Sequence, residues 1–218
     1  GSDEERMPDE AIIFDMDGTL ADSIEQYCRM ARDVTDLTGA PPVPRERVLA
    51  LMGSGQPDLL RRLLPDDFPD AEAALERAVR LRLRGWMRSL DDVDPLPGCI
   101  ELLRHLHRKG YRLGIATSSG RALPYLDRWG VRELFSAIVG REDVRNRKPH
   151  PEPVLLCLAG LGAETGRALY VGDSPIDIAA GRAAGVRTVG VLTGTSPRHV
   201  LETEGPDDDV AGADHLAD

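Results

Sequence analysis

Short apolar runs that alternate with helical patterns are the feature that most restricts the fold of this 218-residue chain. The runs are short enough to be strands buried on both faces, and each is followed by a turn signal. They cover residues 11–14, 112–117, 134–140, 168–172 and 186–192. This alternation predicts an α/β fold in which helices cover both faces of a central parallel sheet.

The helical patterns between the runs carry their own start and stop signals. Residues 98–110 have apolar positions at helical spacing and end in Gly110, while residues 151–162 and 174–185 have prolines near the first turn. The acidic segment 205–214 reads as a loop that precedes a short final strand.

A long segment without strand patterns separates the first two runs. About 90 residues lie between them, whereas a crossover between parallel strands needs only a dozen or more. Within 22–92 the patterns are helical, and near its end Leu75, Val79, Leu83 and Trp86 fall on one stripe. We therefore expect a helical domain at 22–92, inserted into a core domain formed by 8–21 and 93–218.

Composition excludes some classes of partner. The net charge of −10 argues against nucleic acid, and no segment is long and apolar enough to span a bilayer. Cys28, Cys99 and Cys157 form no paired motif, and the acidic N-terminal segment does not resemble a signal peptide. These features predict a cytoplasmic protein and leave its oligomeric state open.

Polar side chains follow four of the five runs at the point where each strand should end. Ligands of open parallel sheets bind beyond the carboxyl ends of the strands, so these side chains should meet at one rim. The residues are Asp15, Asp17, Thr117, Ser118, Lys148, Asp173 and Asp177.

Four carboxylates at one rim would repel each other unless a cation compensates them. Mg²⁺, a hard cation that prefers oxygen ligands, fits this requirement, and it attracts phosphate. Lys148 would add a further positive charge. It is one of only two lysines among 27 basic residues, the other being Lys109. Gly18 and Thr19 permit a tight turn that presents backbone N–H groups to an anion.

Four segments of the chain resemble the motifs of the haloacid dehalogenase superfamily, in order and at fitting separations. They read FDMDGTLADS, IATSS, RKPHPEP and YVGDSPIDIAAGRAAG. With the helical insertion, the resemblance covers nearly the whole chain and is strongest to phosphoglycolate-phosphatase-like hydrolases. It implies a Rossmann-like three-layer core with an inserted α-helical cap, and a Mg²⁺-dependent phosphatase that hydrolyses a small phosphorylated metabolite.

The resemblance also implies catalytic roles. Asp15 would attack phosphorus and form an aspartyl-phosphate, which divides hydrolysis into two easier steps. Asp17 would protonate the leaving oxygen and later deprotonate water. Thr117 would hold phosphoryl oxygens, and Lys148 would neutralise charge on the nucleophile and phosphate.

By the same resemblance, Asp173 would bind Mg²⁺ together with Asp15 and the backbone carbonyl of Asp17, and Asp177 would orient these ligands from behind. Gly18 and Ser118 complete the expected phosphate-binding set.

A loop of the helical insertion is expected to select the substrate. Gly53 and Ser54 lie in this loop, with Gly55 and Gln56 as further candidates. A plain helix–helix turn explains the same residues equally well. Arg61 and Arg62 could clamp a substrate carboxylate, although a solvated helix face accounts for them too.

Other functions are known for chains with related motifs. Dehalogenases of the superfamily lack the acid found here at Asp17, and phosphonatases need a cap lysine, which 22–92 does not contain. A β-phosphoglucomutase-like phosphotransferase stays open, although such enzymes usually have valine at the place of Thr19 and no acid at the place of Asp177. A non-catalytic phosphate-binding or acyl-phosphate signalling module also stays open.

Overall fold

A parallel sheet forms the centre of the computed structural model, which describes residues 10–53 and 59–210. In these residues the sheet has six strands in the order β3-β2-β1-β4-β5-β6, and all neighbouring pairs are parallel. The strands are β1 (Ala11–Phe14), β2 (Arg112–Ala116), β3 (Phe135–Val139), β4 (Ala168–Gly172), β5 (Arg187–Val191) and β6 (Asp208–Val210). The predicted α/β fold with a central parallel sheet is therefore confirmed.

Helices occupy the segments where the sequence predicts them. The α-helices are α1 (Ile24–Thr38), α2 (Arg45–Gly53), α3 (Leu59–Arg62), α4 (Ala71–Asp91), α5 (Cys99–Arg108), α6 (Ala122–Trp129), α7 (Glu152–Leu161), α8 (Pro175–Ala183) and α9 (Arg198–Leu201). Short 3₁₀ turns are η1 (Arg132–Leu134), η2 (Arg141–Asp143), η3 (Thr165–Arg167) and η4 (Glu202–Glu204).

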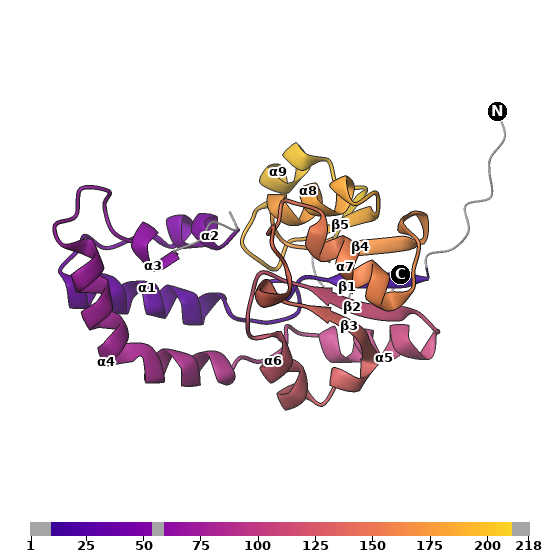
Figure 1. Cartoon of the computed structure of the whole chain (residues 1–218), viewed down its shortest axis with the longest axis horizontal. Helices are drawn as coiled ribbons and strands as arrows, with labels where there is room; N and C mark the ends of the chain where they lie inside the picture. The colour runs from indigo at the N-terminus through magenta and orange to yellow at the C-terminus, as the bar shows by residue number, and fades with distance from the viewer. Residues whose placement is uncertain (1–9, 54–58, 211–218) are drawn as a thin grey trace.

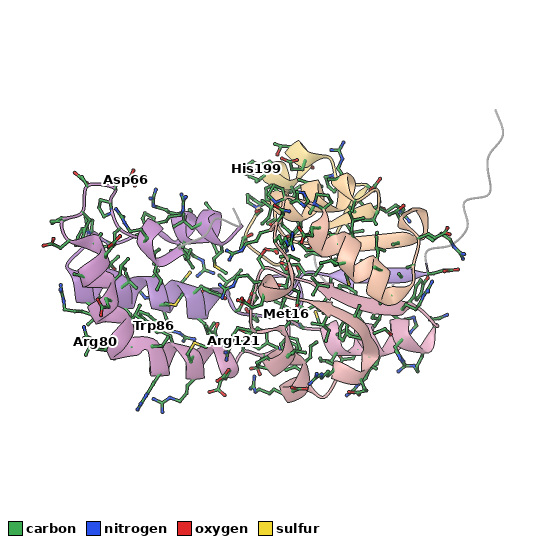
Figure 2. All side chains as sticks on the ribbon, viewed as in Figure 1. Met16, Asp66, Arg80, Trp86, Arg121 and His199 are labelled. Atoms are coloured by element: carbon green, nitrogen blue, oxygen red, sulfur yellow. The ribbon has the colours of Figure 1, made fainter. Side chains whose placement is uncertain are left out.

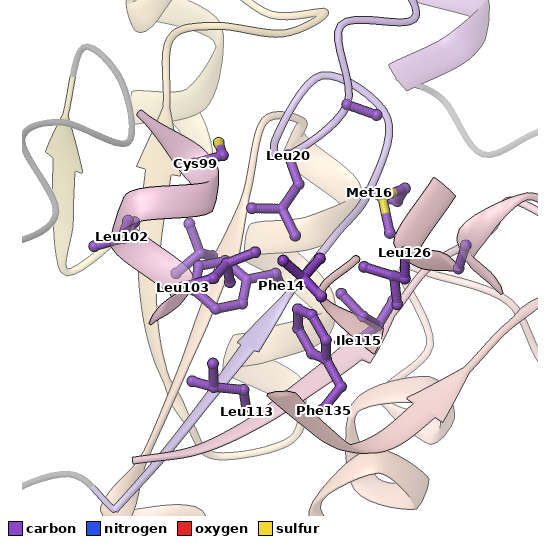
Figure 3. Close-up of a cluster of buried hydrophobic side chains, with 14 of the residues drawn as sticks. Phe14, Met16, Leu20, Cys99, Leu102, Leu103, Leu113, Ile115, Leu126 and Phe135 are labelled. Carbon is purple, nitrogen blue, oxygen red and sulfur yellow. The ribbon is translucent and has the colours of Figure 1, made fainter. Parts of the chain in front are cut away.

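Two hydrophobic clusters lie on opposite faces of the sheet, because successive strand side chains point to opposite sides. Ile12 and Phe14 of β1 pack with α5 and α6, whereas Ile13 packs with α7 and α8. Figure 3 shows the first cluster, with Phe14 beside Leu103 of α5 and Ile115 of β2. The core is thus three layers, as the resemblance implies.

Helices α1 to α4 pack together away from the sheet, at the left of Figure 1. They share a separate hydrophobic cluster that includes Cys28, Val34, Leu64 and Trp86. The indole of Trp86 also donates a hydrogen bond to Asp33 of α1 at 2.8 Å, and Figure 2 shows Trp86 among these helices.

The predicted apolar stripe of α4 is partly wrong. Leu83 is 46% exposed, while Leu75 and Val79 are half-buried. Trp86 is buried as predicted, and the other residues that α4 buries are Ala71, Ala74, Ala78 and Leu90. Three of the five buried residues of α4 are alanines, so the leucine positions did not identify the buried face.

The acidic segment near the end differs from its prediction in one detail. The last strand of the described residues, β6 at Asp208–Val210, lies inside that segment, and the residues after the segment lie outside the described part of the chain. It pairs with β5 at the sheet edge, where Arg187 forms an ion pair with Asp208 at 3.2 Å. Acidic residues are tolerated there because an edge strand is accessible to water.

The two connections to the helical group run side by side. Ala21 forms a bridge with Pro95, and the amide of Asp22 donates to the carbonyl of Asp94 at 2.9 Å. The amide of Leu96 donates to the carbonyl of Leu20 at 2.8 Å. The helical group therefore leaves and rejoins the sheet layers at one place, directly after the residues that follow β1.

Cys28, Cys99 and Cys157 are free and buried. In the described part of the chain, none of the helices has the length and apolar character needed to cross a bilayer.

Candidate active site

The end of β1 directs two carboxylates to one place. The amide of Asp15 continues the ladder to β4 by donating to the carbonyl of Val171 at 2.9 Å. The next side chain, Met16, is fully buried in the core (Figure 2), so Asp15 and Asp17 on either side of it both face a cavity. Alternation along the chain thus turns the two predicted carboxylates towards the same cavity.

The cavity lies where the topology of the sheet predicts a ligand site. Strands β1 and β4 are neighbours, but the chain proceeds from β1 towards β2 and β3 on one side and from β4 towards β5 on the other. Such a switch point opens a crevice beyond the carboxyl ends of the two strands. Asp15 follows β1 and Asp173 follows β4, so one carboxylate comes from each side of the crevice.

Lys148 lies within the group of carboxylates, with only 4% of its surface exposed. Its Nζ donates to Asp15 at 2.9 Å, to Asp177 at 2.5 Å and to the hydroxyl of Tyr170 at 3.1 Å. Burial alone would lower the pKa of Lys148, but the charges of Asp15 and Asp177 outweigh burial and hold the pKa well above its usual value. The ammonium is therefore charged, and its three protons each have an acceptor.

Asp177 is completely buried, and both of its oxygens are engaged. One oxygen accepts from Lys148 and from Tyr170, the latter at 3.1 Å. The other accepts from the backbone amides of Asp173 and Ser174 at 3.2 and 3.1 Å, and from the Ser174 hydroxyl at 2.6 Å. This geometry suits a positioning group that fixes the lysine and the start of α8.

Asp173 is held by neutral donors. Its Oδ2 accepts from the backbone amide and the hydroxyl of Thr195 at 2.6 and 2.9 Å, and the hydroxyl of Thr19 lies 3.3 Å from Oδ1. Burial, followed by the charges of Asp177 and Asp15, raises the pKa of Asp173 well above its usual value. A bound cation would relieve this penalty.

Two glycines make room for Asp173. A Cβ at Gly194 would lie 2.0 Å from its Oδ2, and a Cβ at Gly18 would lie 2.6 Å from the same atom. Gly18 also has a φ of 81°, which other residues rarely adopt. Both positions therefore require glycine for steric reasons.

Three carboxylates crowd together here, and those of Asp15 and Asp173 offer oxygens to a divalent cation, whereas both oxygens of Asp177 are already engaged. Ligand oxygens of Asp15, Asp173 and Asp177 lie within 4.8 Å of one another, and all three side chains are buried. Burial is the main cause that raises the pKa of Asp15 to about 6, with Lys148 opposing it and Asp177 adding to it. The single positive charge of Lys148 does not balance the negative charges of these carboxylates. The cluster of oxygens therefore fits a Mg²⁺ ion.

Asp17 lies apart from that cluster and is only partly buried. Its carboxylate accepts a hydrogen bond from the hydroxyl of Ser23 at 2.6 Å, just before α1 begins. Burial raises the pKa of Asp17, while the hydroxyls of Ser23 and Ser119 oppose the rise. A raised pKa favours the protonated form that a proton donor needs.

The residues after β2 complete the floor of the cavity. The amide of Thr117 donates to the carbonyl of Val139 of β3 at 3.0 Å, and its hydroxyl oxygen accepts from the amide of Ser119 at 3.1 Å. Thr117 is buried, and Ser118 beside it is half-buried and also lines the cavity. The structure thus brings the predicted residues after β1, β2 and β4, together with Lys148, to one site.

The cavity has a volume of about 220 Å³ and reaches the helical group. On that side it is lined by Tyr27, Leu51, Met52 and Leu59. Gly53 ends α2, directly after Met52. Ser54, Gly55 and Gln56 lie outside the described residues.

Arg61 and Arg62 do not line the described cavity. The guanidinium of Arg61 donates to the carbonyls of Pro65 and Asp66, both at 3.1 Å, and so fixes the end of α3. Arg141 and Arg147 line the cavity, although the sequence analysis did not select them.

Other residues of the site were also missed. Tyr170 lies inside an apolar run and looked like an ordinary core residue, yet its hydroxyl joins Lys148 and Asp177 and donates to the carbonyl of Ala116 at 2.8 Å. Gly194 and Thr195 follow β5, and no site residue was predicted after that strand. The rule that strand ends form the site would have found them.

The fold and the site define a class of α/β proteins in which a buried carboxylate and a lysine meet at the switch point of an open parallel sheet. Residues 12–191 match the family model of haloacid dehalogenase-like hydrolases. A phosphoglycolate phosphatase of Cereibacter sphaeroides is 33% identical over 186 residues, which cover 81% of this chain and 82% of that protein. The chain therefore belongs to the haloacid dehalogenase-like hydrolase family.

Solved structures agree with this assignment. The crystal structure of a predicted phosphoglycolate phosphatase from Haemophilus somnus has a TM-score of 0.82 at 26% identity, covering 95% of this chain and 96% of that one. A β-phosphoglucomutase from Clostridium difficile has a TM-score of 0.79 at 22% identity, covering 96% and 93%. At that identity the second likeness concerns the fold alone.

Proposed function

We propose that this protein is a Mg²⁺-dependent phosphatase that hydrolyses a small phosphomonoester through an aspartyl-phosphate on Asp15. The observation that carries the proposal is the buried Asp15 carboxylate at the cavity, 2.9 Å from Lys148 and clustered with Asp173. The family and the phosphoglycolate phosphatase relatives support the same reaction class.

In the first step an oxygen of Asp15 attacks phosphorus, and the bond between phosphorus and the ester oxygen breaks. Lys148 favours the ionised form of Asp15, which is the nucleophile. Asp17 gives its proton to the departing oxygen, which would otherwise leave as an unstable alkoxide. The raised pKa of Asp17 supports this role.

In the second step water attacks phosphorus and gives a proton to Asp17, while the bond between phosphorus and the Asp15 oxygen breaks. Inorganic phosphate leaves, Asp15 returns to its ionised form and Asp17 to its protonated form. Thr117, Ser118 and the backbone around Gly18 hold the phosphoryl oxygens through both steps. Asp177 touches no substrate in this scheme, but its hydrogen bonds keep Lys148 and Asp173 in place.

Asp15, Asp173 and the backbone carbonyl of Asp17 would hold the magnesium ion. When bound, Mg²⁺ would neutralise carboxylate charge and stabilise the negative charge that develops on the phosphoryl oxygens. The crowded oxygens and the raised pKa values of Asp15 and Asp173 support this assignment.

Residues 22–92 would act as a cap over the core formed by 8–21 and 93–218. Their separate hydrophobic cluster and their apolar contribution to the cavity support this division. Excluding bulk water would strengthen the electrostatic contacts inside the site. Gly53 and Ser54 remain candidates for the loop that selects the leaving group. The three free, buried cysteines support a cytoplasmic location.

Phosphate release from a panel of phosphomonoesters, including phosphoglycolate, tests the function. We expect Mg²⁺-dependent release that EDTA abolishes and added Mg²⁺ restores. Asp15→Asn should lower kcat by about 10³-fold or more while the protein stays folded, whereas Asp36→Asn on the exposed face of α1 should keep full activity.

Retained turnover in the Asp15→Asn variant would remove the nucleophile assignment, and indifference to EDTA would remove the metal. A mutase would keep the phosphoryl group on an organic product, and a signalling module would release no phosphate catalytically. Both alternatives are thus decided in the same assay.

A further inference from the structure

Arg147 brings a positive charge to the cavity for which the proposed mechanism has no use. It is exposed, and it lines the cavity together with Lys148, the next residue in the chain. Among residues 10–53 and 59–210, its guanidinium has neither an ion pair nor a hydrogen bond. An arginine has five N–H donors, and their fork matches a carboxylate or a phosphate.

The other cations of the cavity are already engaged. All three protons of Lys148 have acceptors on Asp15, Asp177 and Tyr170. Arg141 forms an ion pair with its neighbour Glu142 at 3.1 Å. An additional anionic group on a substrate would therefore meet Arg147 as the available cation of the described cavity.

The backbone that carries Arg147 is fixed on both sides. The carboxylate of Glu152, at the start of α7, accepts from the amides of Arg145 and Asn146 at 2.8 and 3.0 Å and from the Asn146 side chain at 2.8 Å. The carbonyl of Arg147 accepts from the amide of His150 at 2.9 Å. A fixed backbone lowers the entropic cost of placing the guanidinium on a ligand.

The surroundings favour a small and doubly anionic ligand. Leu51, Met52 and Leu59 form an apolar wall, which strengthens a charged contact by keeping water away. The volume of about 220 Å³ is below the range of roughly 300–1,000 Å³ that is usual for drug-sized ligands.

We propose that Arg147 is a specificity residue that binds a second anionic group, a carboxylate, on a short phosphomonoester substrate. The proposal rests on the proposed phosphatase function and deepens it by naming the substrate class. It also assigns the selection of that group to the segment before α7, outside the helical group.

The test compares phosphoglycolate with its neutral amide, 2-amino-2-oxoethyl phosphate, which has nearly the same shape. The native protein should prefer phosphoglycolate, and Arg147→Gln should lower the ratio of the two kcat/KM values by about tenfold or more. Arg147→Lys should retain part of the preference, because it keeps the charge but loses the fork. Arg145→Gln is the matched control on the same loop and should leave the ratio unchanged.

Equal losses on both esters in Arg147→Gln would overturn the proposal, because they would mean that Arg147 supports the phosphoryl group or the fold. A lost preference in Arg141→Gln but not in Arg147→Gln would overturn it as well.

A binding measurement separates this proposal from the function. Calorimetry with the Asp15→Asn protein and Mg²⁺ should show tighter binding of phosphoglycolate than of the amide, and adding Arg147→Gln should remove the difference. Equal affinities would overturn the inference whether or not the native enzyme turns over. Conversely, a lack of phosphate release from every ester, including p-nitrophenyl phosphate, would overturn the proposed function. The measured affinities would still test the role of Arg147 in that case.

Discussion

The two sides of the cavity are built on different principles. On the sheet side, buried charges are each fixed by several hydrogen bonds, as with Asp177, which accepts from four groups besides the Tyr170 hydroxyl. On the helical side, the lining consists of Tyr27, Leu51, Met52 and Leu59, which offer mainly apolar surface. The helices themselves are held together by a cluster that contains small alanines.

This difference suggests that the sheet side carries the chemical groups and that the helical side encloses the ligand. A fixed set of charges can stabilise a transition state only if it does not have to reorganise during the reaction. An apolar wall needs no such precision, because it acts by excluding water and by its shape. Changes on the sheet side should therefore be severe, and changes on the outer helical faces should be mild.

The largest effect is expected for Lys148→Met. Removing the ammonium leaves Asp15 and Asp177 buried without their cation, which should lower the free energy of unfolding by about 3–5 kcal/mol. The other lysine provides the control, because Lys109 is exposed at the end of α5 and Lys109→Met should change stability by less than about 0.5 kcal/mol. Urea unfolding of the Mg²⁺-free proteins measures both.

Adding Asp177→Asn to the Lys148→Met variant should restore part of the stability, since it removes one of the unpaired charges. Similar stabilities for Lys148→Met and Lys109→Met would show that the sheet side does not depend on charge balance.

A medium effect is expected from pH. The pKa of Asp15 rises from 3.8 to about 6 on folding, so between these values the folded protein holds a proton that the unfolded chain has released. The free energy of unfolding of the Mg²⁺-free protein should therefore fall as pH rises through this window, by roughly 1–3 kcal/mol.

The proposed magnesium site would bind the ion through ionised carboxylates, so the effect of Mg²⁺ on Tm should be larger at about pH 7.5 than at about pH 5. Calorimetry with and without MgCl₂ at the two pH values measures the difference, and Asp173→Asn should remove it. An equal rise in Tm at both pH values would contradict a metal site built from Asp15 and Asp173.

The smallest effect is expected on the outer face of α4. Leu83→Gln should change the free energy of unfolding by less than about 0.5 kcal/mol, because Leu83 is 46% exposed. The same substitution at the buried Leu90 of the same helix should cost about 2–3 kcal/mol. Equal costs at the two positions would mean that the exposed face of α4 is covered in solution.

Much of the sheet and its rim could be predicted, because local patterns determine both. Apolar runs bounded by turns identified β1 to β5, and parallel strands place their carboxyl ends together, which brought Asp15, Asp173 and Lys148 to one place. The helical side was harder, because α4 buries alanines and exposes a leucine, so hydrophobicity did not identify the buried face.

Contacts between distant segments could not be predicted from local patterns. The hydroxyl of Tyr170 reaches Lys148 and the carbonyl of Ala116, which is 54 residues away along the chain. Arg147 was overlooked because an arginine in a polar loop has no local signal. Its position at the cavity depends on how Glu152 holds the loop in three dimensions.

The pairing of Ala21 with Pro95 has a consequence for how such a protein can evolve. The two ends of the helical group meet at adjacent residues. The whole group is therefore an insertion at a single turn of the core. It could be gained, lost or exchanged for another without re-threading any strand. Replacing the helical group would then change the apolar wall of the cavity, while Arg147 and the carboxylates at the strand ends stay as they are.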